Sequence, residues 1–284
     1  MPAHNPESAA THREAIAFIG GGNMARSLIG GLVARGYAGE AIRVAEPVAE
    51  LRDGLQREFG VAVFERASEA ADGASVWLLA IKPQVMRTVC EELTTTAAAQ
   101  TSVVVSIAAG ITAAQMQRWL GRPLPIVRAM PNTPALLGAG ITGLFANAAT
   151  TAAQRDQATQ LLGAVGPTVW VDDEAAIDAV TAVSGSGPAY VFLLAEAMQA
   201  AGVAQGLTAE AARALVNQTL LGAATMLTRL DETAAVLRQR VTSPGGTTQA
   251  AIEVFEARGF AALVDQAIAA ATERGRQLAA ANDR

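Results

Sequence analysis

An apolar run that ends directly in a glycine-rich turn constrains the fold of this chain more than any other feature. Residues 15–19 lead straight into Gly20-Gly21-Gly22-Asn23-Met24-Ala25, and a helical pattern follows. In such a strand–turn–helix unit, the first glycine permits the tight turn and the third lets the backbone approach a pyrophosphate. The N–H groups and the positive dipole end of the helix supply an anion site. We therefore expect the chain to open with a dinucleotide-binding unit.

Apolar strands and amphipathic helices alternate from Glu14 to about residue 171. The predicted strands are 15–19, 42–45, 61–64, 76–81, 103–107, 125–128, 141–146 and 169–171. The predicted helices between them are 23–34, 47–59, 84–94, 113–120 and 152–165. Continuous apolar strands spaced by helices indicate βαβ units and a parallel sheet covered on both faces. The pattern predicts a doubly wound, Rossmann-type α/β fold.

The character of the chain changes after Asp172, where strand patterns stop and alanine-rich helical patterns continue to the end. The predicted helices are 174–205 with a glycine-rich interruption, 208–230, 233–239, 247–257 and 260–280, with Thr208 and Asp231 as N-caps. We expect a disordered tail over 1–13, a Rossmann domain over 14–172 and an all-helical domain over 173–284. A helical domain rich in small residues favours a subunit interface, so we expect a homo-oligomer.

Charge and cysteine content narrow the class of protein. The net charge of −5 and pI near 5.2 argue against nucleic acid or an anionic membrane as the partner. The longest uncharged stretch, 129–154, contains prolines, asparagines and threonines that a lipid-facing helix would not tolerate, so we expect no membrane span. Cys90 is the only cysteine, which rules out an intramolecular disulfide and fits a reducing cytoplasm.

The basic residues narrow the chemistry as well. His4 and His12 both lie in the N-terminal tail, which argues against a histidine acid–base catalyst, a Ser-His-Asp triad or a histidine-bound metal. Lys82 is the only lysine among the 21 lysine and arginine residues. A coding bias towards arginine explains the missing lysines but not the one present, so Lys82 is a candidate for the active site.

The end of the second predicted strand bears on the choice between NAD and NADP. Glu46 stands there, and a carboxylate at this position accepts hydrogen bonds from a ribose 2′-hydroxyl and repels a 2′-phosphate. Alternatively, Glu46 caps the helix that opens at Pro47. The residue favours NAD, although Arg43 or Arg52 could still reach a phosphate.

Two segments of the helical half contain more glycine and proline than helices need. Residues 181–190 read Thr-Ala-Val-Ser-Gly-Ser-Gly-Pro-Ala-Tyr, and residues 241–248 read Val-Thr-Ser-Pro-Gly-Gly-Thr-Thr. Close helix packing is one explanation of the first segment. The second places N–H and hydroxyl donors at a helix start, which suits a small carboxylate ligand.

These motifs together resemble one family. The turn at 20–25, Ala-Ile-Lys-Pro at 80–83, Arg-Ala-Met-Pro-Asn-Thr-Pro at 128–134 and the two helical-half segments look like pyrroline-5-carboxylate reductase, collinearly from about residue 14 to 280. The resemblance implies reduction of 1-pyrroline-5-carboxylate to L-proline with NADPH or NADH, the final step of proline biosynthesis. It also implies a Rossmann domain with a helical dimerisation domain, and dimers that often assemble into decamers.

Carried onto this sequence, the resemblance implies a set of site residues. The cofactor contacts that it implies are Gly20, Gly21, Gly22, Asn23, Met24, Ala80, Ile81, Lys82, Pro83, Ala108 and Ala109. Glu46 is added to them from its place at the end of the second predicted strand. The substrate contacts that it implies are Glu174, Thr247 and Thr248. Gly246 is added to them because it stands at the donor-rich helix start, and no metal is expected. Thr248 and Lys82 are the residues assigned to catalysis: the Thr248 hydroxyl bonds the ring nitrogen, and Lys82 orients the cofactor or nearby carbonyls. Glu46 and Ala67 depart from the family pattern, and both put a preference for NADP in question.

Three other classes of protein fit less well. β-Hydroxyacid dehydrogenases use a lysine in the helical domain, and none follows Lys82. Ketol-acid reductoisomerase needs acidic metal ligands on its helices, and Glu196, Glu210 and Asp231 are too scattered for that purpose. A non-catalytic cofactor-binding protein would not need Thr248 and the glycine pair before it.

Overall fold

The computed structural model describes residues 14–282, so the predicted disordered tail over 1–13 lies outside the described residues. The chain divides into two compact units, one running up to Gly185 and resuming at Ala271, the other spanning Ser186–Ala270. The predicted boundary after residue 172 falls earlier than this division. The reason is local: helix α8 (Ala176–Val180) packs on strands β6 and β7 and so belongs with the sheet.

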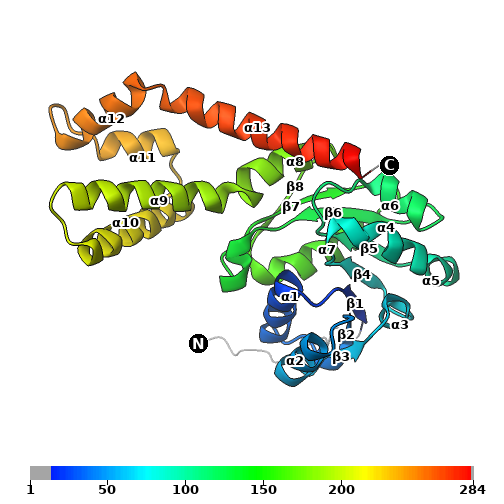
Figure 1. Ribbon diagram of the computed structural model, residues 1–284. Coiled ribbons are helices and arrows are strands. Elements are labelled where there is room, and N and C mark those ends of the chain that lie inside the picture. The colour runs from blue at the N-terminus through cyan, green and yellow to red at the C-terminus, as the bar shows by residue number, and fades with distance from the viewer. Residues whose placement is uncertain (1–13, 283–284) are drawn as a thin grey trace, which may run out of the picture. The chain divides into compact units, whose positions relative to one another are not determined.

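The first unit is built on one eight-stranded sheet, in the order β3-β2-β1-β4-β5-β6-β7-β8 (Figure 1). The strands are β1 (Ile16–Ile19), β2 (Ile42–Ala45), β3 (Ala62–Phe64), β4 (Val76–Leu79), β5 (Val103–Ser106), β6 (Ile126–Met130), β7 (Thr142–Ala146) and β8 (Thr168–Trp170). Each corresponds to one predicted strand, which confirms the Rossmann-type fold. Strand β1 lies between β2 and β4, so the strand order reverses there and creates the edge at which such sheets bind ligands.

One pairing corrects the expectation of an all-parallel sheet. Strand β7 runs antiparallel to β6, with Ala129 opposite Leu144. The link between them spans only 131–141 and contains the 3₁₀ helix η2 (Thr133–Leu137), so it is too short for the crossover helix that a parallel pair requires.

Helices cover both faces of the sheet (Figure 1). Those of the first unit, besides α8, are α1 (Asn23–Ala34), α2 (Ala49–Phe59), α3 (Ala67–Ala71), α4 (Pro83–Glu92), α5 (Thr94–Ala99), α6 (Ala113–Trp119) and α7 (Ala152–Leu162), with the 3₁₀ helices η1 (Gly39–Ala41) and η3 (Gly163–Val165). The sequence pattern predicted neither α3 nor α5, because five or six residues are too few to show a helical period.

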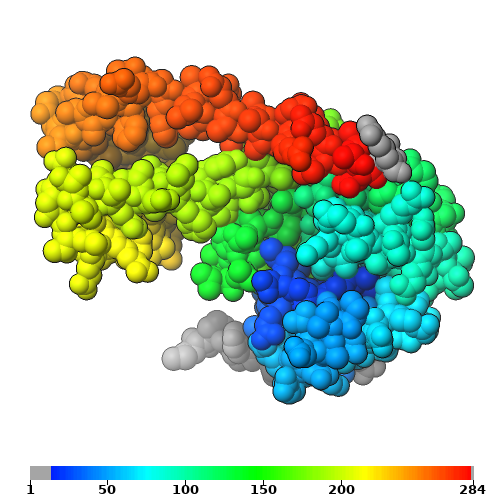
Figure 2. All heavy atoms as spheres, in the orientation of Figure 1, coloured from blue at the N-terminus to red at the C-terminus, as the bar shows by residue number. Residues whose placement is uncertain are grey.

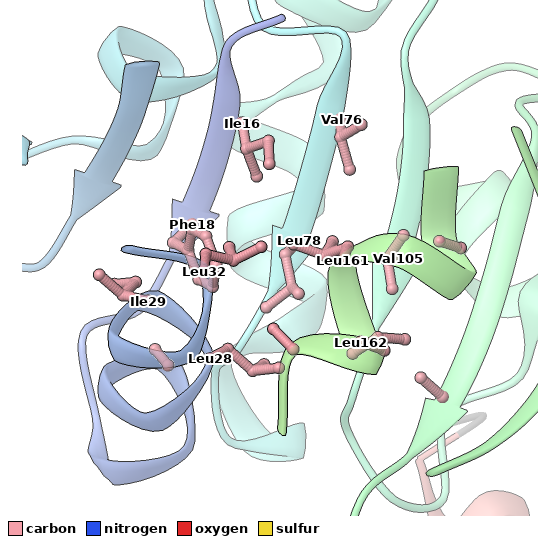
Figure 3. Packing of buried hydrophobic residues seen from close by; sticks show 14 of the residues in the cluster. Ile16, Phe18, Leu28, Ile29, Leu32, Val76, Leu78, Val105, Leu161 and Leu162 are labelled. Carbon is pink, nitrogen blue, oxygen red and sulfur yellow. The ribbon is translucent and has the colours of Figure 1, made fainter. Parts of the chain in front are cut away.

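Successive side chains along each strand point to opposite faces of the sheet, so the core forms two layers. In β1, Ile16 and Phe18 belong to one cluster of buried residues, while Ala17 and Ile19 belong to the other. The first cluster packs under α1, α2 and α7, as Figure 3 shows for Leu28, Leu161 and their neighbours. The second packs under α3, α4, α5 and α6 and includes the buried Trp77 and Cys90. The core therefore lies on both faces of the strands that carry the glycine turn.

The second unit is helical. It contains α9 (Gly187–Ala204), α10 (Ala209–Arg229), α11 (Ala234–Arg240), α12 (Thr247–Ala257) and the first part of α13 (Phe260–Ala281). Helices α9 and α10 pack side by side. The Thr208 hydroxyl accepts the Ala211 N–H, as predicted for the N-cap of α10. The predicted N-cap at Asp231 is wrong, because Thr233 accepts the Val236 N–H and begins α11 two residues later.

Many large apolar side chains of the second unit, which is coloured yellow-green to orange in Figure 2, are exposed. Phe192 and Leu193 are each 67% exposed, and Leu221 and Val254 are exposed to a similar degree. In the described residues, one helix, Ala176–Ala204, is long and apolar enough to cross a bilayer by length and composition alone. Exposed apolar side chains in such number on one helical unit are typical of an interaction face.

Candidate active site

The glycine turn has the geometry that the sequence predicted. Gly20 has a φ of +101°, and a Cβ built there would lie 2.5 Å from the carbonyl oxygen of Ala80, so no larger residue fits. Gly22 is the N-cap of α1, with no side chain bonded to the helix start and nothing within 4 Å of an added Cβ. The first amides of α1, from Asn23 and Met24 onward, have no partner within the helix and no side-chain cap. Such a cradle fits the pyrophosphate of a dinucleotide.

Glu46 is tied to this turn. The carboxylate follows β2 and is only 8% exposed. Its Oε2 accepts the Gly21 N–H at 2.9 Å, and its Oε1 accepts the Val48 N–H at 3.0 Å. The capping alternative is thus correct in part, since Val48 is the N-cap of α2. The same side chain also stands at the strand end that faces a bound ribose in this fold.

Arg43 and Arg52, the two arginines considered for a 2′-phosphate, have different surroundings in the structure. The Arg43 guanidinium donates to the carbonyls of Glu69 and Ala70 at 2.6 and 2.9 Å and lies over the Phe64 ring. Arg52 remains at the cofactor edge, where its Nη1 donates to the carbonyls of Glu46 and Pro47 at 2.7 and 2.9 Å. Ala67, the other departure from the family pattern, is buried at the start of α3.

The remaining predicted cofactor residues lie at the carboxyl ends of β4 and β5. Ala80 and Ile81 follow β4, Lys82 is the N-cap of α4, and Pro83 is its first residue. The Lys82 side chain is exposed and has no hydrogen bond or ion pair with residues 14–282. Beyond β5, the Ala108 N–H bonds the Ser106 hydroxyl at 3.3 Å, and Ala109 follows. The fold therefore gathers all the predicted cofactor residues at one edge of the sheet.

The first glycine-rich segment of the helical half forms a π-helix over Thr181–Gly185. The Asn132 amide nitrogen donates to the Ser184 carbonyl at 3.2 Å, while its Oδ1 accepts the Ile141 N–H at 3.0 Å. A Cβ on Gly185 would lie 2.7 Å from Cε of Met130, which agrees with the close-packing explanation of this glycine. Asn132 thus joins the end of β6 to the π-helix, a contact that the proline-rich loop around it did not reveal.

The predicted carboxylate cradle lies in the second unit, at the start of α12. Gly246 is the N-cap and has no side-chain cap, and a Cβ there would lie 2.6 Å from the Ser243 hydroxyl oxygen. Gln249 accepts the Gly245 N–H at 2.7 Å, which holds the turn in place. No hydrogen bond of the Thr247 or Thr248 hydroxyl occurs within the described chain. The helix start thus presents amide and hydroxyl donors to a ligand.

Glu174, the fourth predicted substrate residue, lies in the first unit, where it has structural partners. Its Oε1 accepts the N–H of Ala113 at 2.7 Å and bonds Nη1 of Arg128 at 3.1 Å. Arg128 is 4% exposed, and Asp178 is close enough to interact with its charge. Burial raises the pKa of Asp178, while Arg128 and Arg276 oppose that rise. The sequence analysis missed this cluster, although an arginine inside a predicted core strand is a signal that could have revealed it.

The fold and the glycine cradle define a class of protein: a nicotinamide-dinucleotide-dependent oxidoreductase with a helical C-terminal region. Among the described residues, no group of three or more histidines, cysteines or acids could hold a metal ion.

Two family models match the chain. Residues 15–110 match the coenzyme F420-dependent NADP oxidoreductases, and residues 174–278 match the dimerisation region of pyrroline-5-carboxylate reductase.

Individual relatives agree with these matches. Pyrroline-5-carboxylate reductase of Pseudomonas aeruginosa is 55% identical over 264 residues, covering 93% of this chain and 96% of that protein. The solved structure of the Coxiella burnetii reductase has a TM-score of 0.91 at 43% identity, covering 94% of this chain and 99% of that one. The NADP-bound Plasmodium falciparum reductase has a TM-score of 0.82 at 26% identity, covering 95% and 99%.

The chain belongs to the pyrroline-5-carboxylate reductase family. It is an NAD(P)H-dependent oxidoreductase of proline biosynthesis, and residues 174–278 form its dimerisation domain. The apolar surface of the second unit, including most of the long helix Ala176–Ala204, lies within that domain.

Proposed function

We propose that this chain reduces 1-pyrroline-5-carboxylate to L-proline with two glycine-rich helix starts, one of which binds the cofactor and the other the substrate. The glycine turn at 20–24 binds the cofactor pyrophosphate, and Ala80–Pro83 with Ala108 and Ala109 line the same edge. NAD(P)H, when bound, supplies the hydride that adds to the imine carbon. The protein's own contribution is to bind and orient the reactants, since an exposed imine nitrogen takes its proton from water. The observation that carries this proposal is the open Gly22 cradle.

The substrate carboxylate is assigned to the start of α12. Gly246, whose own N–H donates to the Ser243 carbonyl at 3.0 Å, shapes this helix start. The amides of Thr247 and Thr248 bind the carboxylate, and the Thr248 hydroxyl bonds the ring nitrogen. Two features support this role. The helix start lacks a side-chain cap, and two hydrogen bonds hold the turn before it, from the Gly246 N–H to the Ser243 carbonyl at 3.0 Å and from the Gly245 N–H to Gln249 at 2.7 Å. Glu174 is the substrate residue that the family resemblance adds in the first unit; its Oε1 accepts two hydrogen bonds, and its Oε2 accepts none from residues 14–282.

Lys82 orients the cofactor and transfers no proton. Its ammonium is exposed beside the loop after β4 and pairs with no carboxylate of the described chain. A compact cation at that position attracts the dinucleotide phosphates without needing to titrate.

The chain works in the cytoplasm as a homodimer, and its dimers assemble into a homodecamer. Residues 14–172 bind the cofactor, and residues 173–284 bind the substrate and form the subunit interface. The exposed apolar side chains of α9 and α10 are buried by a second copy and not by lipid, which agrees with the dimerisation match over 174–278. The net charge of −5 fits a small-molecule substrate and no nucleic acid partner.

Steady-state kinetics of Thr248→Ala and Thr248→Ser test this assignment. We expect Thr248→Ala to lower kcat/KM for pyrroline-5-carboxylate by about 10–100-fold, the loss of one hydrogen bond to the reacting ring, with cofactor affinity unchanged. Thr248→Ser keeps the hydroxyl and restores most of the activity. Wild-type kinetics in Thr248→Ala would remove Thr248 from the site.

A further inference from the structure

We propose that Glu46 makes this enzyme prefer NADH over NADPH, and that it does so as a fixed part of the glycine turn. The inference rests on the cofactor site proposed above and adds to it the choice between the two dinucleotides. Its basis is the pair of hydrogen bonds that the Glu46 carboxylate accepts, from the Gly21 N–H at 2.9 Å and from the Val48 N–H at 3.0 Å.

The carboxylate cannot rotate away from this position at low cost. Doing so would leave two backbone N–H donors without their charged acceptor, one in the turn and one at the start of α2. The Cβ and Cγ of Glu46 also lie 3.2 and 3.3 Å from where a Gly21 Cβ would be, so the side chain packs on the turn. Arg52 holds the main chain at the same point through the carbonyls of Glu46 and Pro47.

A fixed carboxylate discriminates between the two cofactors. Each of its oxygens keeps a lone pair after accepting one N–H, so it still accepts a hydrogen bond from a ribose 2′-hydroxyl. A 2′-phosphate at the same place would bring two negative groups together in a largely buried environment, which is unfavourable. Arg43 cannot offset this repulsion, because its guanidinium is bonded to the carbonyls of Glu69 and Ala70.

The same geometry predicts that Glu46 affects the binding of both cofactors. Because the carboxylate positions the Gly21 amide, its removal disturbs the turn that binds the pyrophosphate common to NADH and NADPH. A short uncharged residue at position 46 therefore does not simply convert the enzyme to NADPH. This behaviour distinguishes a positioning residue from a side chain that only contacts the ribose.

The test is fluorescence titration of the full-length apo enzyme with NADH and with NADPH, without substrate. We expect the wild type to bind NADH at least about tenfold more tightly than NADPH. Glu46→Ser should weaken NADH binding by about tenfold or more, because both N–H ties are lost. Glu46→Asp keeps the charge but is too short to span both donors, so it should weaken both cofactors while keeping the preference for NADH. Glu50→Gln, on the exposed first turn of α2, is the matched control and should bind like the wild type.

Three outcomes would overturn the proposal: a wild type that prefers NADPH, a Glu46→Ser variant with unchanged NADH affinity, or a Glu46→Asp variant that binds both cofactors as the wild type does. Glu46→Asp retains the buried charge, so it keeps the test informative if Glu46→Ser fails to fold. Because no substrate is present, a negative result here leaves the reduction of pyrroline-5-carboxylate untouched, whereas failure of that reaction appears only in the Thr248 kinetics.

Discussion

Arg128 and Glu174 form an ion pair at 3.1 Å that joins strand β6 to the segment before α8, and the arginine side chain is only 5% exposed. Glu174 also accepts the first N–H of α6, from Ala113. The residue that the family resemblance placed at the substrate is therefore also a structural link within the first unit.

Glu174→Ala should destabilise the first unit by about 2 kcal/mol. Breaking a fully buried pair costs about 3–5 kcal/mol, and the Glu174 side chain is 28% exposed, which reduces the loss. The measurement is urea unfolding followed by tryptophan fluorescence. Glu91→Ala, which removes an exposed pair with Arg87, is the control and should change stability by less than about 0.5 kcal/mol. Equal effects of the two substitutions would contradict the structural role of Glu174.

Alanine at Gly20 and at Gly22 should have different consequences. Gly20→Ala forces a Cβ against the Ala80 carbonyl at a φ of +101°, so we expect a loss of about 2 kcal/mol or more in stability. Gly22→Ala meets no protein atom within 4 Å and should fold almost normally, but its methyl group occupies the pyrophosphate space and should weaken cofactor binding by about 100-fold. Thermal unfolding and cofactor titration of the two variants check this contrast. Normal cofactor affinity in Gly22→Ala would argue against the cradle.

Lys82→Ala should raise KM for the cofactor a few-fold and leave kcat and its pH profile unchanged. The ammonium is exposed, so its attraction for the phosphates is screened by solvent and salt. The measurement is kcat and KM for the cofactor between about pH 6 and 9, at low and high salt. Loss of one limb of the pH profile would instead make Lys82 a proton donor.

Cys90 should resist thiol reagents in the folded enzyme. Burial, with a smaller contribution from Glu91, raises the pKa of the Cys90 thiol from 9.0 to about 12. The folded pKa lies above the unfolded one, so this contribution to stability is fully present below pH 9 and is lost as the pH rises from 9 to 12. We expect no reaction with Ellman's reagent at about pH 8 until urea unfolds the chain. The urea midpoint should fall less between pH 9 and 10 in Cys90→Ala than in the wild type.

Local patterns predicted the elements of the fold closely. The helices at 23–34 and 247–257 have the predicted bounds, because Gly22 and Gly246 mark their starts and the apolar period fixes their length. The antiparallel β7 could not be predicted from its residues, since the direction of a strand depends on the length of the link before it and on the neighbour it meets. The short helices α3 and α5 were missed because they have too few residues to show a helical period in their apolar positions.

The sequence alone determined the reductase family and the two glycine-led helix starts, since a turn of glycines before a helix is a local feature that needs no distant partner. The tertiary structure decided which long-range partners the charged residues have. It directed Arg43 away from the cofactor edge, paired Arg128 with Glu174, and tied Glu46 to Gly21 across 25 residues of sequence. The physical reason is that a buried charge must find its hydrogen-bond partners among groups that only the folded sheet brings together.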